Sequence, residues 1–304
     1  MTQPIISVII PTYNRYHLIG ETLESLIAQS FLPWECIVVD DGSKDYTNEL
    51  LWFYTQKDSR IKYFQRPENM PKGANSCRNY GLRQSKGKYI NWLDSDDLIY
   101  SDKLEKQLSN IEEYGAEIAI CKYGYLKLNN KIRFIEKKRV YNNFDTGVDL
   151  LKTFGKYQEY LPVHTYLIAR GVFNSAGIWN EMISINQDGE FLSRILSKCE
   201  RVIFVDTYVI YRKSQIDNVS LVSDEKKGEG LIQSWKLIEE NLRFHTECKE
   251  YVLSGKKTVY NRLKNKYDSL ILNDLLFFKP TMSKVNYMLL VTKLKYKKFE
   301  KYFN

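Results

Sequence analysis

The clearest chemical feature of the sequence is the acidic run at residues 93–97, Leu-Asp-Ser-Asp-Asp, which directly follows a short apolar segment. Carboxylates two positions apart, where the chain turns after a strand, can face the same cavity. A hard divalent cation such as Mg²⁺ or Mn²⁺ relieves their mutual repulsion and also binds phosphate oxygens. The alternative is helix capping, because Asp97 and Ser101 precede a helical pattern.

Polar residues also follow two other apolar segments. At residues 38–43, a carboxylate could accept a hydrogen bond from a nucleobase, and Gly42 allows a tight turn beside a ligand. The alternative here is an ordinary turn with an Asp cap. At residues 10–15, Tyr13 could stack on a base, or the segment could simply be a loop that begins a helix.

Two further segments carry groups suited to binding or catalysis. Residues 72–81 combine small residues with an expected helix N-terminus, which suits an anion, and Arg78 could meet a phosphate or a base. In residues 186–191, a carboxylate at the start of a helix could be a general base. Alternatively, Asp188 caps that helix and Glu190 interacts with its dipole.

The elements that must position these groups alternate along the chain. Apolar, β-branched runs predict strands at residues 5–10, 35–39, 61–65, 89–93 and 117–122. Helical spacing predicts helices at residues 17–29, 45–54, 73–84 and 102–114. This alternation indicates a mostly parallel sheet with helices on both faces, where ligands bind at the carboxyl ends of strands. We therefore expect the polar groups after residues 10, 39 and 93 to meet at one edge.

The pattern changes after about residue 126. It predicts a helix at residues 188–196, two short strands at residues 202–205 and 208–211, and an all-helical segment after about residue 220. Lysines gather in the last of these segments, particularly after residue 293.

The order and spacing of the polar segments resemble glycosyltransferase family 2, inverting enzymes of the GT-A fold. The matching segments are residues 7–15, 39–43, 73–81, 93–97, 187–191 and the pair Tyr211-Arg212. The resemblance implies an α/β fold with a mostly parallel, helix-flanked central sheet. It also implies a nucleotide-sugar-binding half at 1–125, an acceptor-binding half at 126–220 and a helical basic extension at 221–304.

The same resemblance implies roles for individual residues on the donor side. Asp96 matches the metal ligand, for Mn²⁺ or Mg²⁺, with Asp94 beside the ribose or the metal, and Asp40 matches the base-contacting carboxylate. The residues expected around the nucleotide sugar are Pro11, Thr12, Tyr13, Arg15, Asp40, Asp41, Arg78, Asp94 and Ser95.

On the acceptor side, Asp188 aligns with the catalytic base. Gln187 replaces the acid that usually precedes it, so Glu190 is kept as the fallback. His164 and Trp179 are candidates for lining the acceptor site, and burial in the core is the alternative for both. Relatives often carry a His after the Tyr-Arg pair, where this chain has residues 213–215, Lys-Ser-Gln; a third metal ligand near Ser214 is therefore in question.

This layout suits a direct displacement at an anomeric carbon. A divalent cation offsets the charge of a leaving nucleoside diphosphate, and one carboxylate deprotonates the acceptor hydroxyl. The resemblance to this family leads us to expect transfer with inversion from a UDP-sugar to a glycan or lipid-linked acceptor, in synthesis of a bacterial-type polysaccharide or glycoconjugate. The alternatives are a sugar-phosphate nucleotidyltransferase, whose Gly-rich loop after the first strand is missing here, and a non-catalytic nucleotide-sugar-binding protein.

The net charge of +8 and pI of about 9.0 permit phosphate, nucleic acid or an anionic membrane as partners. No nucleic-acid-binding motif is recognised, so we expect no nucleic acid. The lysine-rich C-terminal helix could lie on a membrane carrying lipid-linked acceptors, or could pack with its lysines in water. The scattered cysteines and the shortness of the apolar runs favour a cytoplasmic protein, and the basic C-terminal helix adds the inner face of the membrane as an alternative location.

Overall fold

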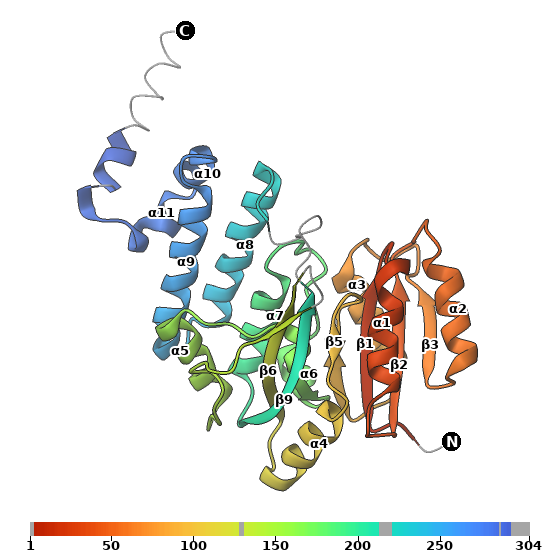
Figure 1. The fold of residues 1–304 in the computed structure, drawn as a ribbon. Coiled ribbons are helices and arrows are strands. Elements are labelled where there is room, and N and C mark those ends of the chain that lie inside the picture. The colour runs from red at the N-terminus through yellow and green to blue at the C-terminus, as the bar shows by residue number, and fades with distance from the viewer. Residues whose placement is uncertain (1–2, 128–130, 213–220, 286, 293–304) are drawn as a thin grey trace.

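The computed structural model describes residues 3–127, 131–212, 221–285 and 287–292. Its described strands form a 9-stranded sheet in the order β3-β2-β1-β4-β8-β6-β9-β5, with β7 paired to β6, and helices flank the sheet (Figure 1). The strands are β1 (Ile6–Thr12), β2 (Trp34–Asp40), β3 (Ile61–Gln65), β4 (Tyr89–Trp92), β5 (Leu98–Ile99), β6 (Ile118–Leu126), β7 (Ile132–Phe134), β8 (Leu167–Ala169) and β9 (Val202–Arg212). The α-helices are α1 (Tyr16–Ile27), α2 (Thr47–Lys57), α3 (Ala74–Gln84), α4 (Lys103–Tyr114), α5 (Gly147–Tyr157), α6 (Val172–Ala176), α7 (Gln187–Ser197), α8 (Glu225–Asn241), α9 (Lys249–Leu263), α10 (Asp268–Asn273) and α11 (Leu275–Phe278). Short 3₁₀ helices are η1 (Val163–Thr165), η2 (Thr246–Cys248) and η3 (Lys279–Thr281).

The first half of the sheet is parallel. Strands β3, β2, β1 and β4 lie side by side, and every residue of β1 and β2 is buried, which agrees with their predominantly apolar sequences. Helix α3 lies so close to β1 that a Cβ on Gly81 would come within 2.6 Å of the Ile9 side chain. This close packing fixes the start of α3 relative to the strand ends.

The second half of the sheet is mixed. Strand β8 runs antiparallel between β4 and β6, whereas β9 runs parallel to β6. The prediction of two short strands at residues 202–205 and 208–211 is wrong, because β9 is one strand with a local irregularity. Cys121 pairs with Val205 and the next residue, Lys122, pairs with Tyr208, so the polar residues between them bulge out of the ladder.

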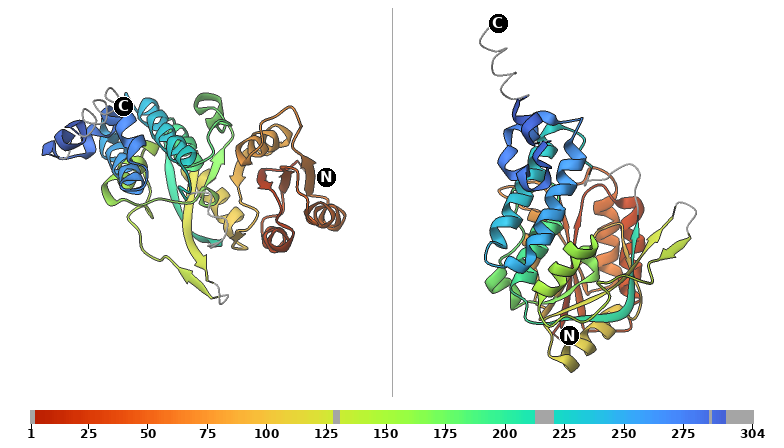
Figure 2. Two further views of the ribbon diagram at one scale, coloured as in Figure 1. Left: turned by 90° about the horizontal axis from the view of Figure 1, so that it is seen from above. Right: turned by 90° about the vertical axis from the view of Figure 1, so that its left-hand side faces the viewer.

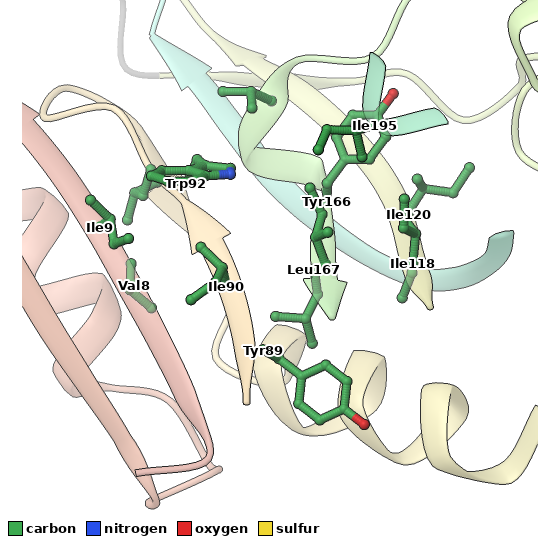
Figure 3. Packing of buried hydrophobic residues seen from close by; sticks show 14 of the residues in the cluster. Val8, Ile9, Tyr89, Ile90, Trp92, Ile118, Ile120, Tyr166, Leu167 and Ile195 are labelled. Atoms are coloured by element: carbon green, nitrogen blue, oxygen red, sulfur yellow. The ribbon is translucent and has the colours of Figure 1, made fainter. Parts of the chain in front are cut away.

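One hydrophobic core joins the two halves. Figure 3 shows Val8, Ile9 and Trp92 on one side of this core and Tyr166, Leu167 and Ile120 on the other. Because apolar contacts continue across β4 and β8, the edge of the sheet where β1 and β4 end is held firmly against the second half.

The described part of the chain after residue 220 is helical, as the sequence predicts. Helix α8 packs on α7, and α9 packs on α5 and α8, at the end of the molecule farthest from β3 and α2 (Figures 1 and 2). A second apolar cluster lies among these helices and includes Leu231, Val259 and Phe278. Residues 284–285 and 287–292 are also helical, and within the described ranges no helix has the length and apolar character to cross a bilayer.

Candidate functional site

The carboxyl ends of the parallel strands meet at one edge of the sheet, as predicted. Thr12, the last residue of β1, pairs with Asp40, the last residue of β2, and the Asp41 N–H donates to the Thr12 carbonyl at 2.9 Å. Strand β4 ends beside them, where the Leu93 N–H donates to the Ile9 carbonyl at 3.0 Å and Asp94 follows. Three of the polar segments therefore line a common edge.

The loop after β2 is held in shape by hydrogen bonds to the carboxylates of Asp40 and Asp41. Asp40 is fully buried, and its Oδ2 accepts from the backbone N–H groups of Ser43 at 2.8 Å and Gly42 at 3.2 Å. Asp41 is ion-paired with Arg66 and accepts from the Gly73 N–H at 2.9 Å, which ties β2 to the start of α3. Asp40 thus shapes the turn in this structure, and its contact with a base remains a prediction.

The loop after β1 presents an aromatic ring at this edge. Asn14 adopts a positive φ of 51° and bonds to the neighbouring loop, donating from its N–H to Ser43 Oγ and accepting from the Lys44 N–H, each at 2.8 Å. Pro11 and Thr12 are buried, whereas Tyr13 is 49% exposed. Of the residues predicted on this loop, Tyr13 is the one whose ring is open to a stacking partner.

The acidic run concentrates negative charge beside the strand ends. Burial, and then the charge of Asp94, raise the pKa of Asp96 to about 6. Burial, together with the charges of Asp96 and Asp94, raises the pKa of Asp97 well above its usual range. A cation bound here would offset both causes, because it would stabilise the buried charges and relieve the repulsion between the carboxylates. The capping alternative is not supported, because α4 begins after Asp102 without a side-chain cap.

His164, from η1, lies behind the acidic run. Its Nδ1 is 3.2 Å from Asp97 Oδ2, and potential ligand atoms of Asp94, Asp97 and His164 all lie within 4.8 Å of one another. Among the described residues, His164 Nε2 has no hydrogen-bond partner, and Asp97 Oδ2 and His164 Nδ1 have no partner other than each other, without forming an aligned hydrogen bond. Burial lowers the pKa of His164 to about 4, so the imidazole is neutral near pH 7. Neutral imidazole and unpartnered carboxylate oxygen are groups that fit a divalent cation.

Arg78 connects the donor side to the second half of the chain. Its guanidinium donates to Asp94 at 2.9 Å and to Gln187 at 3.1 Å, and it lies 4.4 Å from the centre of the Trp179 ring. Trp179 also stacks on Phe191 with ring centres 3.9 Å apart and is only 2% exposed. Trp179 therefore packs against the Arg78 guanidinium. Like His164, it is buried and offers no exposed ring face to an acceptor.

Asp188 lies in the first turn of α7, half buried, facing this cluster. Its carboxylate accepts from the Val163 N–H, and burial raises its pKa to about 6, with Arg78 lowering the pKa and Asp94 raising it. Helix α7 starts from Asn186 at a φ of 55°, so Asp188 is not its N-cap. The fallback candidate, Glu190, is 3% exposed and pairs with Arg194 at 2.7 Å. Of the two carboxylates, Glu190 is engaged by Arg194, whereas Asp188 faces Arg78 and Asp94, and its role as base remains a prediction.

Strand β9 brings two residues to the site for which the sequence suggested no role. Tyr211 stacks parallel to His164 with ring centres 6.0 Å apart, and burial and then the charges of Asp97, Asp94, Asp96 and Asp188 raise its pKa to about 12. Arg212 donates from its backbone N–H to Asp97 at 2.7 Å and from Nε to the Asp96 carbonyl at 2.9 Å. In the sequence, the pair Tyr211-Arg212 matched the family pattern, and this match is the feature that could have identified both residues as part of the site. The position of Ser214 lies outside the described residues.

Comparison with known proteins agrees with this arrangement. The family model described as Glycosyl transferase family 2 matches residues 7–166. TuaG of Bacillus subtilis, a glycosyltransferase proposed to act in teichuronic acid biosynthesis, is 40% identical over 124 residues, which are 41% of this chain and 48% of TuaG. The chain spans from 21% to 59% of the length of other glycosyltransferases that it matches, from Rickettsia conorii and Rickettsia typhi.

Solved structures share the fold at low sequence identity. A segment of S. aureus TarS in complex with UDP superimposes with a TM-score of 0.68 at 20% identity, covering 87% of this chain and 74% of that segment. The mannosyltransferase PcManGT from Pyrobaculum calidifontis, in complex with GDP-Man and Mn²⁺, gives a TM-score of 0.60 at 16% identity, covering 99% and 82% of the two chains.

Proposed function

The chain belongs to glycosyltransferase family 2 and has the GT-A fold, and from this premise we propose that it transfers a sugar from a nucleoside-diphosphate donor to an acceptor hydroxyl with inversion. The observation that supports the proposal most strongly is the crowding of Asp94, Asp96, Asp97 and Asp188 around one edge of the sheet. Burial raises the pKa of Asp96 and of Asp188 to about 6, and carboxylates perturbed in this way beside further acids are placed to bind a cation and to accept a proton.

The donor would be bound by the first half of the chain, residues 1–125. Tyr13 is exposed where a base can stack on it, and Arg78 and Arg15 are cations near the acidic run. Asp96 and Asp94 would hold Mn²⁺ or Mg²⁺ on the open side of the cluster, because a diphosphate must reach the cation and Asp97 and His164 are each 1% exposed. When bound, the cation offsets the charge that develops on the leaving diphosphate.

The acceptor would be bound by residues 126–220, with Asp188 as the general base. The Val163 N–H orients the Asp188 carboxylate, and burial keeps its pKa high enough to accept a proton near neutral pH. As the acceptor oxygen bonds to the anomeric carbon, its proton passes to Asp188, and the bond from that carbon to the diphosphate breaks. Attack opposite the leaving group inverts the anomeric centre.

We favour UDP as the nucleotide, because TarS binds UDP, although PcManGT binds GDP-Man. A thermal-shift screen of UDP, GDP, dTDP and CDP with Mn²⁺ tests this choice. The expected result is stabilisation by UDP in the wild-type protein and none in Asp96→Ala. Stabilisation by another nucleotide alone would correct the donor, and no stabilisation by any of them would contradict the proposal.

The helical extension, residues 221–304, would hold the enzyme at the inner face of a membrane during polysaccharide synthesis. Val285, Met288 and Leu289, from the helical residues 284–285 and 287–292, are each more than 60% exposed, and lysines are frequent in the sequence after them, outside the described residues. Flotation with phosphatidylglycerol liposomes should carry the full chain upward and leave a truncation before Thr281 behind. Equal flotation of both proteins would rule out this role.

A further inference from the structure

Four tyrosines and a histidine form a continuous aromatic ladder that leads from the carboxylate cluster to the surface. Tyr211 stacks on His164, and Tyr125 meets the Tyr211 ring edge-on with centres 5.9 Å apart. The ladder continues from Tyr125 to Tyr160, whose hydroxyls are 3.0 Å apart. Tyr123 completes it, 5.5 Å from Tyr125 and 6.0 Å from Tyr160 between ring centres. We call these residues the tyrosine ladder.

The pairing of β6 with β9 determines where three of these rings lie. Tyr125 of β6 pairs with Tyr211 of β9 in the parallel register, so their side chains lie on the same face of the sheet. Tyr123 is two residues from Tyr125 and shares that face, but it is only 2% exposed and forms the floor. The rings of Tyr123, Tyr125 and Tyr211 are therefore positioned by backbone pairing of β6 with β9, and Tyr160 and His164 pack against them.

The outer end of the ladder is open and rigidly held. Tyr160 is 55% exposed. The neighbouring Glu159 accepts from the backbone N–H groups of Arg139 at 3.2 Å and Val140 at 3.1 Å. The Lys138 ammonium lies 5.4 Å from the centre of the Tyr160 ring and 5.6 Å from that of Tyr123. An exposed ring fixed beside a cation and several hydroxyls presents both an apolar face and hydrogen-bonding groups.

The ladder is also linked to the candidate base. Tyr160 precedes by three residues Val163, whose N–H donates to the Asp188 carboxylate. At the inner end, Tyr211 stands within electrostatic reach of Asp188 and the acidic run. A ligand lying along Tyr160 and Tyr125 would thus extend toward Asp188.

We infer that the tyrosine ladder is a subsite for a carbohydrate acceptor, binding the sugar unit next to the one that is glycosylated. A pyranose ring offers axial C–H groups to an aromatic face and hydroxyls to phenol and ammonium groups, which matches the chemistry of Tyr160, Tyr125 and Lys138. This inference rests on the proposed function for its orientation toward Asp188, and it identifies the acceptor as a glycan.

Saturation-transfer NMR with defined glycosides tests the subsite. The probes are the methyl glycosides and β-1,4-linked disaccharides of glucose, galactose and N-acetylglucosamine, added to the protein with Mn²⁺ and UDP. We expect saturation of at least one of these sugars by the wild-type protein, and at least tenfold weaker binding to Tyr160→Ala. Tyr125→Phe, which keeps the ring and removes its hydroxyl, should weaken binding by a smaller factor.

Tyr157→Ala is the matched control, because Tyr157 is also exposed and lies three residues away but is not part of the ladder. Its sugar binding should equal that of the wild-type protein. Equal sugar binding by Tyr160→Ala, or no saturation of any sugar by the wild-type protein, would overturn the inference. UDP affinity is measured in the same samples. A wild-type protein that does not bind UDP would count against the proposed function. Normal UDP affinity together with unchanged sugar binding in Tyr160→Ala would count against the subsite alone.

Discussion

Replacing Asp188 with Asn tests the assignment of the general base. The substitution keeps the size of the side chain and its acceptor for the Val163 N–H, but it removes the basic oxygen. Because general-base help contributes roughly 10²–10⁴-fold, UDP release from a UDP-sugar should slow by about that factor, while UDP affinity changes little. The assay is release of UDP with Mn²⁺ present, to water or to an added sugar, at saturating donor.

The pKa of Asp188 adds a pH dependence to this prediction. A carboxyl with a pKa of about 6 is about nine-tenths ionised at pH 7 and about one-tenth ionised at pH 5. The wild-type rate should therefore fall by about tenfold between these pH values. Protonation of Asp96, whose pKa is also about 6, would weaken metal binding in the same range, so UDP affinity must be measured at each pH and its change separated from the rate.

Glu190→Gln is the matched control for this experiment. Glu190 is buried and paired with Arg194, so its substitution should lower thermal stability and leave the rate within about tenfold of the wild-type value. The reasoning is refuted if Asp188→Asn retains the wild-type rate. It is equally refuted if Glu190→Gln loses 10²-fold or more while remaining folded, because the base would then be Glu190.

Other expectations concern binding and stability. Arg78→Lys keeps the charge but loses the planar fork that joins Asp94 and Gln187, so UDP affinity measured by titration calorimetry should fall by about tenfold or more; unchanged affinity would contradict this role. Lys103 is fully buried with a pKa lowered from 10.5 to about 8, so its charged form is disfavoured in the folded state, and stability should rise with pH between about 8 and 10.5. Lys103→Met removes this titration together with the hydrogen bond that Lys103 donates to Gln107 at 2.8 Å. In urea denaturation, the stability of the wild-type protein relative to Lys103→Met should therefore rise by about 2–3 kcal/mol between pH 7 and pH 10, and a pH-independent difference would be inconsistent with this cause. Gly81→Ala should cost about 1–3 kcal/mol by the same measurement, since its Cβ would meet Ile9 at 2.6 Å, whereas Gly20→Ala, with a nearest contact of 3.4 Å, should be neutral or stabilising.

The parallel half of the fold could be predicted from local pattern, because β1, β2 and β4 are buried throughout, β3 is a short segment rich in aromatic and β-branched residues, and turn residues follow the strands. The bounds predicted for β3 agree with the structure, and those of β1, β2 and β4 differ by one or two residues. Since parallel strands end at the same edge, the meeting of Thr12, Asp40 and Asp94 followed from strand order alone.

The second half could not be predicted to the same depth, because its pairings join distant residues. Nothing local in Val202–Arg212 shows that this strand lies beside β6, or that Asp206 and Thr207 bulge from one strand instead of separating two. The same long-range pairing places Tyr211 over His164 and Arg212 against Asp96 and Asp97. His164 and Trp179 were recognisable by residue type, but their burial depends on this packing and not on their sequence neighbours.

Titration calorimetry of UDP into the protein, with Mn²⁺ or with EDTA, tests most directly whether the acidic edge holds a metal-bound diphosphate. The account predicts binding that requires Mn²⁺ and that weakens at least tenfold in Asp96→Asn. UDP binding of equal strength in EDTA, or undiminished binding by Asp96→Asn, would contradict it.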